Sequence, residues 1–534
     1  MKKLLVVLCA MTPLISFAQL NYPNYESIQS KINLTKKNPF VSLSSIGQSY
    51  AGEAIPIIKL EKDSSPRPTL LLVAGLDGKH PAGVVSSIEV IQSLLALKAD
   101  SLNKLLANKS IWVVPMANPD AYKRNISSGV FASGNGRVID NDRDGRLDED
   151  AAKDLNGDGV LAQMRIKSSA GTHIMHPTFV DVLSPADRSK GEIGQYLLFN
   201  EGVDNDFDGR YGEDGQGGVN PDKNFTYDYP AFQSESGNYA GSEPESKALM
   251  EFIYTNPQIS TILHFGLSNN LSEGERYNAS KANQRIIGSW SENDVSVSKY
   301  ISSIYKESVK ELGEATKMEH TSGNFSNTAY YHMGRFSFST PLWWPSISKE
   351  SKSSKSSSST DLFYQWVEEN HVSGAVLPWT KINHPNFPNE EVEVGGVVEI
   401  YKNNPPLTYL KRPSELHAAF IQRLLNAMPE LKFQKPVITA LSGDIYRVEL
   451  TVTNVGMMPT YPEIADKIKH VGKLKTVCEL NSNQAFLSGK RLQLYASLAA
   501  GKSQTFSWLI KGKGTIHIQA GCPTSGEINL DVKL

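Results

Sequence analysis

Apolar and polar positions follow two alternating patterns over most of the chain. Short continuous apolar runs at 69–74 and 110–116 are typical of strands that are buried on both faces of a sheet. Apolar residues at helical spacing follow the first run over 84–95, and a further helix and strand are predicted at 243–254 and 259–265. Strands that alternate with helices predict an α/β domain with a largely parallel or mixed sheet.

The pattern changes after about residue 435. Apolar residues occupy every second position in 446–452, 506–510 and 516–518, and glycine-rich turns separate these runs. A period of two over short segments predicts a small antiparallel β-sandwich. We therefore expect a first domain over residues 19–435 and a β-sandwich domain over 436–534.

The first 18 residues have the pattern of a signal peptide. Lys2 and Lys3 precede an apolar stretch that runs from Leu4 to Phe17, and Ser16-Phe17-Ala18 is a small-x-small cleavage site. The mature protein is therefore expected to be secreted or periplasmic. No later apolar run reaches the roughly 18 residues that a membrane-spanning helix needs.

The charge balance of the chain restricts the classes of partner that it could bind. The 54 Lys and Arg residues nearly balance the 56 Asp and Glu residues and are spread along the chain, which argues against nucleic acid as a partner. No feature of the sequence specifies an oligomeric state.

Removal of the signal peptide leaves Cys478 and Cys522, which either form one disulfide in an oxidising compartment or remain two buried thiols.

Three acidic segments share a pattern close to D-x-[DN]-x-D-G. Their candidate ligands are Asp140, Asp142 and Asp144, then Asp154, Asn156 and Asp158, then Asp204, Asp206 and Asp208. Oxygen ligands at alternate positions with a glycine turn suit a hard cation such as Ca²⁺. The twelfth positions, however, hold Ala151, Arg165 and Gly215 where an EF-hand has a bidentate Glu. Calcium loops and acidic turns without metal both remain open.

Several segments, in their order and spacing, resemble the zinc carboxypeptidases of the carboxypeptidase A type, in a long bacterial form with acidic insertions. They include VAGLDGKH at 73–80, PMANPDAY at 115–122, GSEPESKAL at 241–249, LHFG at 263–266 and EVEVGG at 391–396. The resemblance implies an α/β fold with a carboxypeptidase-like mixed sheet flanked by helices, followed by the small C-terminal antiparallel β-sandwich.

The resemblance also implies a zinc site made of two His and one Glu, with a fourth position open to water. The first two ligands of the family come from an H-x-x-E motif, where this chain has Asp77 and His80, and the third matches His264. Asp77, His80 and His264 together still have the composition of a two-His, one-carboxylate site. A retained zinc site and a polar loop without metal both remain open.

Other catalytic positions of the family are replaced. The general-base Glu aligns with Pro341, which has no ionisable group. Asp222 and Lys223 occupy the Asn and Arg positions that grip the substrate carboxylate, and a Lys lacks the planar bidentate grip of Arg. Arg165 matches the oxyanion-stabilising Arg of the family only loosely.

These replacements favour a secreted pseudopeptidase that keeps the peptide-binding scaffold, with a peptide or protein C-terminus as its partner. Loss of groups that act as one catalytic unit costs orders of magnitude in rate. Two alternatives remain. The first is a divergent zinc metallocarboxypeptidase or amide hydrolase that uses Asp77, His80 and His264. The second is a calcium-stabilised binding module, whose melting temperature would rise with Ca²⁺ and be indifferent to zinc.

Overall fold

The computed structural model describes most of the 534-residue chain. The described residues are 20–129, 131–139, 150–205, 207, 209–212, 218–314, 318, 320–346, 359–470 and 472–534. The predicted calcium ligands Asp140, Asp142, Asp144, Asp206 and Asp208 lie outside the described residues, as does the predicted signal peptide.

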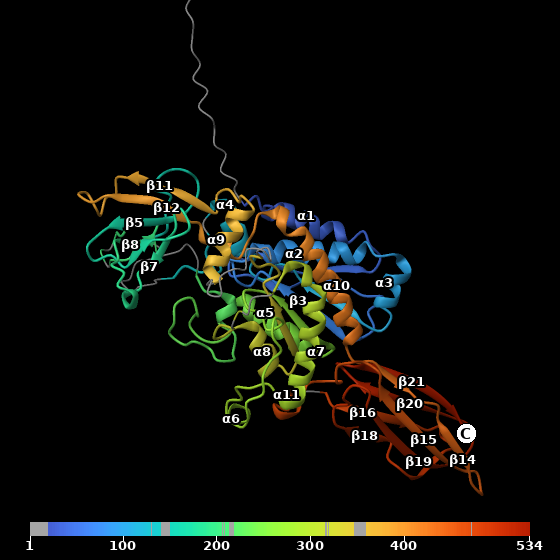
Figure 1. Cartoon of the computed structure of the whole chain (residues 1–534). Coiled ribbons are helices and arrows are strands. Elements are labelled where there is room, and N and C mark those ends of the chain that lie inside the picture. The colour runs from blue at the N-terminus through green and yellow to red at the C-terminus, as the bar shows by residue number, and fades with distance from the viewer. Residues whose placement is uncertain are drawn as a thin grey trace, which may run out of the picture.

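A six-stranded mixed sheet forms the centre of the larger part of the molecule (Figure 1). Its strands, in spatial order, are β1 (Val41–Gln48), β2 (Ala54–Leu60), β4 (Ser110–Val114), β3 (Thr69–Ala74), β9 (Ile259–Phe265) and β10 (Phe336–Thr340). β3 runs parallel to both β4 and β9, β9 runs parallel to β10, and the β1–β2 and β2–β4 pairs are antiparallel. The predicted mixed sheet is confirmed.

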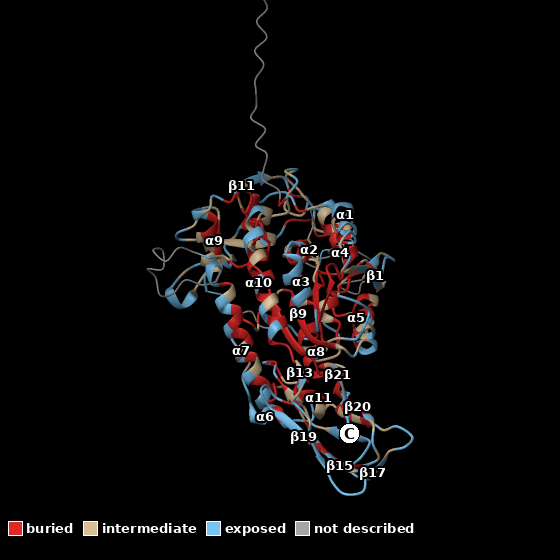
Figure 2. Cartoon of the chain, turned by 90° about the vertical axis from the view of Figure 1, so that its right-hand side faces the viewer, coloured by how far each residue is buried: buried red, intermediate tan, exposed pale blue. Residues whose placement is uncertain are grey.

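Helices pack on both faces of this sheet because its central strands are apolar on both sides. Leu70 and Leu72 of β3 join a core with α2 (Pro81–Leu95), α7 (Glu292–Ser308) and α10 (Lys411–Ala427). The alternate β3 residues join a second core, which also contains residues of α5 (Pro244–Thr255) and α8 (Phe325–Tyr331). Figure 2 shows the buried residues running through the sheet and the inner sides of these helices. The remaining α-helices are α1 (Tyr25–Thr35), α3 (Ala99–Leu105), α4 (Pro119–Ser128), α6 (Ala279–Ala282), α9 (Ser359–Glu369) and α11 (Glu463–Lys467).

A second six-stranded sheet lies beside the first one and was not expected (Figure 1). Its order is β11 (Val376–Ile382), β12 (Val392–Val397), β5 (Gln163–Lys167), β8 (Tyr196–Asn200), β6 (His173–Met175) and β7 (Leu183–Pro185). Every pairing in it is antiparallel. The region between the second and third acidic segments therefore supplies strands, and β5 among them pairs with a segment some 200 residues later in the chain.

Two antiparallel sheets form the C-terminal part. One contains β13 (Leu431–Phe433), β15 (Ile445–Asn454), β19 (Ser503–Lys511) and β17 (Ala485–Ser488), with β14 (Val437–Ala440) also paired to β15. The other contains β18 (Leu492–Tyr495), β16 (Leu474–Glu479), β20 (Thr515–Cys522) and β21 (Gly526–Lys533). Cys478 and Cys522 are both buried in the core between them and are free thiols, so the alternative with a disulfide is wrong.

The C-terminal part is attached to α7 by a buried polar contact. Both carboxylate oxygens of Asp294 accept backbone N–H groups at the start of α11, from Glu463 at 2.9 Å and from Ile464 at 3.2 Å. Tyr330 donates its hydroxyl to the same carboxylate at 2.8 Å.

Membrane-spanning potential is limited in the described residues. None of the single helices described is long and apolar enough to cross a membrane, and the α2–α3 pair meets that test only together, across a bend of 114°.

Candidate functional site

The sequence-predicted catalytic positions gather at the carboxyl edge of the central sheet. The loop after β3 carries Asp77 and ends at His80, the residue that precedes α2. His264 lies near the end of β9 and is paired in register with Val73 of β3, and Pro341 directly follows β10. Because parallel strands end at a common edge, these segments meet where α/β proteins usually place their functional loops.

His80 is buried, with an exposed fraction of 1%. Its Nε2–H donates to the carbonyl oxygen of Pro341 at 3.3 Å, which leaves Nδ1 as the unprotonated ring nitrogen, and Nδ1 has no hydrogen-bond partner. Burial lowers the pKa of His80. The imidazole is therefore neutral at neutral pH and is held by the backbone carbonyl of Pro341, the residue predicted to stand at the general-base position.

His264 is equally buried and is packed between other groups. Its Nδ1 lies 3.3 Å from the hydroxyl of Ser326, its ring meets the Phe325 ring edge-on at 5.6 Å, and its Nε2 has no hydrogen-bond partner. Burial lowers the pKa of His264 to about 3, and the neighbouring His80 contributes in the same direction. Gly266 allows this packing, since a β-carbon there would lie 2.3 Å from the imidazole Cε1.

Both carboxylate oxygens of Asp77 accept hydrogen bonds that fix its loop. One carboxylate oxygen accepts the backbone N–H of Lys79 at 2.8 Å. The other accepts the side-chain amide of Asn220 at 2.9 Å, which ties the loop to a segment 143 residues later in the chain. The carboxylate therefore has a structural role at this edge of the sheet.

The fit of a catalytic zinc to these residues is poor. Such a site needs three protein ligands and an open position for water. Among the residues that the structure describes, no group of three or more His, Cys, Asp or Glu side chains could hold a metal ion. His80 and His264 are both closed to solvent, and Asp77 bonds to Lys79 and Asn220. Zinc at Asp77, His80 and His264 thus has no support from the geometry.

The segment at the general-base position is a buried, strained turn. Pro341 and Leu342 are buried, and Leu342 has a φ of 69°, a left-handed conformation that is unusual for a leucine. The turn is fixed because the Leu342 N–H donates to the Thr340 hydroxyl at 3.1 Å, and that hydroxyl lies 2.7 Å from the Tyr305 hydroxyl. The turn is buried and places no ionisable side chain at residue 341, the predicted general-base position.

The two predicted carboxylate-clamp residues are both engaged elsewhere. The Asp222 carboxylate accepts the N–H of Phe325 at 2.9 Å, and desolvation, with a smaller contribution from Asp77, raises the pKa of Asp222 to about 7. The Lys223 ammonium lies 2.6 Å from the Glu235 carboxylate. Lys223 is thus already neutralised by a carboxylate of its own chain.

Arg165 lies in the second sheet. It makes a 2.8 Å ion pair with Glu393 of the adjacent strand β12. Its guanidinium also lies 4.6 Å from the centre of the Tyr196 ring and 4.2 Å from that of Trp379. Ion pairing and cation–π stacking use both its charge and its planar faces, so Arg165 stabilises this sheet.

The described members of the acidic loops hold turns. The Asp154 carboxylate accepts N–H groups from Gly157 at 2.7 Å and Gly159 at 2.8 Å, and Asn156 donates to Asp158 at 2.9 Å. The Asp204 carboxylate likewise accepts the Gly209 N–H at 3.0 Å. In the second loop and the described part of the third, these contacts are those of acidic turns, and calcium binding at the three segments stays a prediction.

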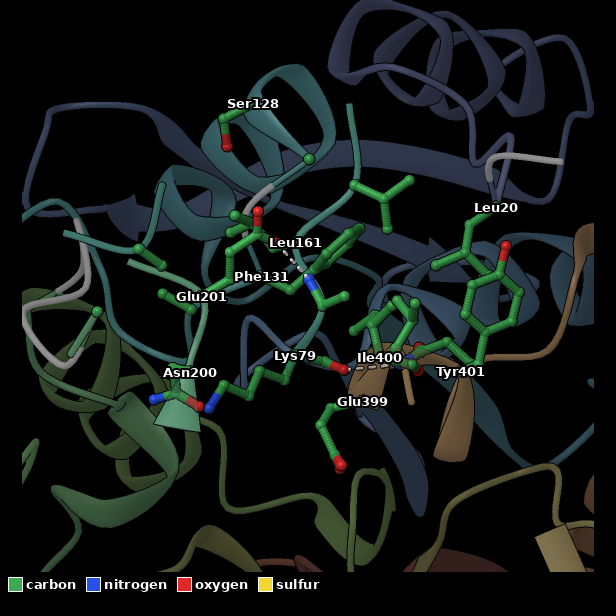
Figure 3. Close-up of a pocket in the computed structure, with 18 of the residues that line it drawn as sticks. Leu20, Lys79, Ser128, Phe131, Leu161, Asn200, Glu201, Glu399, Ile400 and Tyr401 are labelled. Atoms are coloured by element: carbon green, nitrogen blue, oxygen red, sulfur yellow. Dashed lines mark hydrogen bonds between the residues drawn. The ribbon is translucent and has the colours of Figure 1, made fainter. Parts of the chain in front are cut away.

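A cavity of about 910 Å³ lies beside the Asp77–His80 loop and was missed at the sequence level. Figure 3 shows side chains that line it, with Lys79, Phe131, Glu201 and Tyr401 among them. Its lining comes from segments that are far apart in the chain: Leu20, Tyr22, Lys79, Ile126, Phe131, Glu201, Glu235, Val397, Glu399, Ile400 and Tyr401 are among its residues. The one local indication of this cavity in the sequence is Lys79, which lies in the DGKH segment together with Asp77 and His80.

Glu201 fixes one wall of this cavity. Its carboxylate accepts the N–H groups of Leu155 at 2.6 Å and Ala162 at 2.9 Å and so attaches the second acidic loop to the end of β8. Burial raises the pKa of Glu201 to about 7. This carboxyl is a positioning group and carries at most part of a charge at neutral pH.

The family of the chain follows from its match to a family model described as "Zinc carboxypeptidase", which covers residues 30–352. The chain belongs to the zinc carboxypeptidase family. The matched region contains the sheet edge with Asp77, His80, His264 and Pro341. Residues 430–533 match a second model, described as a domain of unknown function.

Curated relatives match parts of this zinc carboxypeptidase-family chain. A zinc carboxypeptidase of Saccharothrix mutabilis subsp. capreolus is 26% identical over 119 residues, which are 21% of this chain and 27% of that protein. Zinc carboxypeptidase A 1 of Drosophila melanogaster is 28% identical over 96 residues, or 17% of this chain and 22% of that protein. The chain thus matches about a quarter of the length of these relatives.

Solved structures are also similar to the chain, at low sequence identity. Thrombin-activatable fibrinolysis inhibitor has a TM-score of 0.42 at 13% identity, with 76% of each chain covered. Carboxypeptidase A from Helicoverpa armigera has a TM-score of 0.39 at 13% identity, with 75% of each chain covered.

Proposed function

We propose that this member of the zinc carboxypeptidase family is a pseudopeptidase, which binds peptides on the family scaffold without hydrolysing them. The observation that carries the proposal is the turn at Pro341. The general-base position holds a side chain that cannot accept a proton, and its backbone carbonyl accepts the hydrogen bond of His80. Without a base to deprotonate the attacking water, hydrolysis loses a contribution of roughly 10²–10⁴-fold in rate.

The closure of the sheet edge supports the same proposal. His80 and His264 each have an exposed fraction of 1%, so neither ring faces a space that a substrate carbonyl and a water could share. Asp77 is used to attach the loop to Asn220. Groups that act as one catalytic unit lose nearly all of their effect once one of them is removed, and here the base and the ligand geometry are both changed.

The proposed place of action is outside the cytoplasm, as a secreted or periplasmic protein, and the proposed partner is a peptide or the C-terminus of a protein. The signal-peptide pattern of the first 18 residues supports the location. The cavity of about 910 Å³ beside the loop supports the partner, because its size suits a short peptide segment.

Release of C-terminal amino acids tests the proposal. The mature protein is incubated with benzoylglycyl-L-phenylalanine and added Zn²⁺, and free phenylalanine is measured by chromatography. We expect no release above the enzyme-free blank, while an active zinc carboxypeptidase in a parallel sample releases phenylalanine. Release that a chelator abolishes would overturn the proposal.

A divergent metalloenzyme is the second candidate, and one observation favours it. His80 Nδ1 and His264 Nε2 are both buried ring nitrogens without a hydrogen-bond partner, and neutral imidazoles are metal ligands. The candidate requires a third ligand from outside the described clusters and bound metal in the purified protein. Its mark would be hydrolysis that disappears in a His264→Ala variant.

A further inference from the structure

The cavity beside the Asp77–His80 loop contains a cation, Lys79, that no carboxylate among the residues described by the structure neutralises. Polar and apolar residues share the wall in nearly equal parts, and Ile126, Phe131 and Tyr401 are among its apolar members. Three carboxylates and one ammonium also line it, namely Glu201, Glu235, Glu399 and Lys79. The balance among these charged groups decides which ligand the cavity suits.

The carboxylates are all occupied by groups of the chain. Glu235 is paired with Lys223 at 2.6 Å, and Glu399 is paired with Lys402 at 2.8 Å. Glu201 accepts two backbone N–H groups and titrates near pH 7. Within the described part of the chain, by contrast, no carboxylate lies in ion-pair distance of the Lys79 ammonium.

Lys79 is rigidly held at its backbone and extended at its side chain. Its N–H donates to Asp77 at 2.8 Å, and its carbonyl accepts the Asn404 amide at 2.8 Å. The Asn404 side chain also accepts the Ala82 N–H at 3.1 Å, so it joins Lys79 to the first turn of α2. The exposed side chain of Lys79 reaches across the cavity toward Asn200 (Figure 3). A fixed backbone with a projecting ammonium reduces the entropy that binding must overcome.

We propose that Lys79 anchors the C-terminal carboxylate of a peptide whose last side chain is apolar, in place of the family clamp at Lys223. This inference rests on the proposed peptide-binding function and adds the residue that sets its specificity. An anion is expected opposite an ammonium that has no ion-pair partner among the described residues, and an apolar side chain suits the part of the wall that contains Ile126, Phe131 and Tyr401.

The presence of one ammonium in the lining also restricts the kind of anion that the cavity suits. A carboxylate carries one negative charge, whereas a phosphate monoester carries close to two at neutral pH. Lys79 is the one ammonium in the lining of the cavity, so the second negative charge of a phosphate would have no second cation there to balance it. The cavity therefore favours a monocarboxylate over a phosphate.

Binding of a matched pair of probes tests the anchor. Benzoylglycyl-L-phenylalanine and its C-terminal amide differ only in the charge of the terminus, and isothermal titration calorimetry at pH 7 measures both. We expect the acid to bind the wild-type mature protein about 10- to 100-fold more tightly than the amide, as is typical of a charge-assisted hydrogen bond. Lys79→Met should reduce this ratio to about 1 by weakening the acid alone, and Lys79→Arg should restore most of it.

Two control variants test whether the effect of Lys79→Met on the binding ratio comes from loss of the anchor or from a change in the charge of the protein. Lys247→Met removes an equally positive but remote, exposed lysine on α5 and should leave the ratio unchanged. The double variant Lys223→Met/Glu235→Gln removes the internally neutralised pair at the family clamp, and it should also leave the ratio within about 2-fold. Circular dichroism shows whether each variant is folded.

Three outcomes would overturn the inference: equal binding of acid and amide by the wild type, no binding of the acid, or an unchanged ratio in Lys79→Met. Loss of the ratio in Lys223→Met/Glu235→Gln would reassign the anchor to Lys223 and overturn it as well. Free phenylalanine in the same samples would overturn the proposed function while leaving the assignment of Lys79 intact.

Discussion

Replacement of Glu245 by Gln should change how the stability of the protein depends on pH. Glu245 lies in the first turn of α5 and is completely buried, with an exposed fraction of 0%. Its carboxylate accepts the Tyr50 N–H at 2.8 Å and the Asn135 amide at 2.9 Å. Desolvation outweighs these bonds and raises the pKa of Glu245 from its ordinary value of 4.5 to about 7.

The sign of the effect follows from proton linkage. Because the pKa of Glu245 is higher in the folded than in the unfolded state, the folded state keeps a proton that the unfolded chain releases. The contribution of Glu245 to stability is therefore fully present below pH 4.5 and is lost as the pH rises to about 7. At about 1.36 kcal/mol for each pH unit in this window, the total is about 3 kcal/mol.

The Gln variant removes this pH-dependent contribution and adds a constant loss. Its side-chain oxygen can still accept the Tyr50 N–H, but its NH₂ group then faces the NH₂ group of Asn135. The Asn135 amide cannot turn over without loss, since its oxygen accepts N–H groups from Arg137 and Val219. The lost bond costs about 1–2 kcal/mol at every pH. We expect the variant to be less stable than the wild type at pH 5 and more stable by about 1–2 kcal/mol at pH 8.

Urea unfolding followed by tryptophan fluorescence between pH 4.5 and 8.5 measures both curves. Glu251→Gln is the matched control, because Glu251 lies on the same helix with a side chain 67% exposed, and its curve should follow that of the wild type. Asp222, Glu201 and Asp294 also have raised pKa values, and they contribute equally to both proteins. Parallel curves for Glu245→Gln and the wild type would refute the reasoning.

Three further substitutions test separate parts of the structure. Pro341→Glu places a carboxylate at the predicted general-base position but buries it. We therefore expect a loss of about 2–4 kcal/mol in unfolding free energy and no release of C-terminal amino acids. Release of C-terminal amino acids by this variant would contradict the account. Asp294→Ala leaves the N–H groups of Glu463 and Ile464 without an acceptor, and urea unfolding should show a loss of about 2–4 kcal/mol; an unchanged midpoint would argue against this attachment of the C-terminal part. Arg165→Lys keeps the charge but loses the stacking on two aromatic rings, which should cost about 1–2 kcal/mol, and equal thermal stability of the two proteins would count against that role.

The central sheet was predictable because its strands have a strong local signal. The run at Thr69–Ala74 is apolar at every position, and the structure places a strand there with the same bounds. Ile259–Phe265 agrees equally well. Strands buried on both faces need no alternation, so a continuous apolar run is sufficient to mark them.

The second sheet was missed because its strands are short and are paired across long sequence separations. β6 and β7 have three residues each, and β5 pairs with β12 through Arg165 and Glu393, which are 228 positions apart. The side chains of β8 are only partly buried, so they show no clear alternation. The signal for such strands is in their tertiary partners and not in the local pattern.

The residues of the candidate site could be identified from the sequence, but their burial and their contacts could not be predicted from it. The expectation that Pro341 stands at the general-base position comes directly from the resemblance to the family motif. The burial of His264, the use of Asp77 to hold Asn220 and the pairing of Lys223 with Glu235 depend on contacts made only in the folded chain. The proposed role of Lys79 could not be predicted from the sequence, because it depends on a cavity whose walls come from segments far apart in the chain.

Zinc content is the most direct test of the central claim that the catalytic site has been lost. The mature protein is incubated with excess Zn²⁺, freed of unbound metal by gel filtration, and analysed by plasma mass spectrometry beside a His264→Ala variant. The account predicts much less than one zinc per chain in the wild type and no difference between the two proteins. One zinc per wild-type chain, lost in His264→Ala, would contradict it.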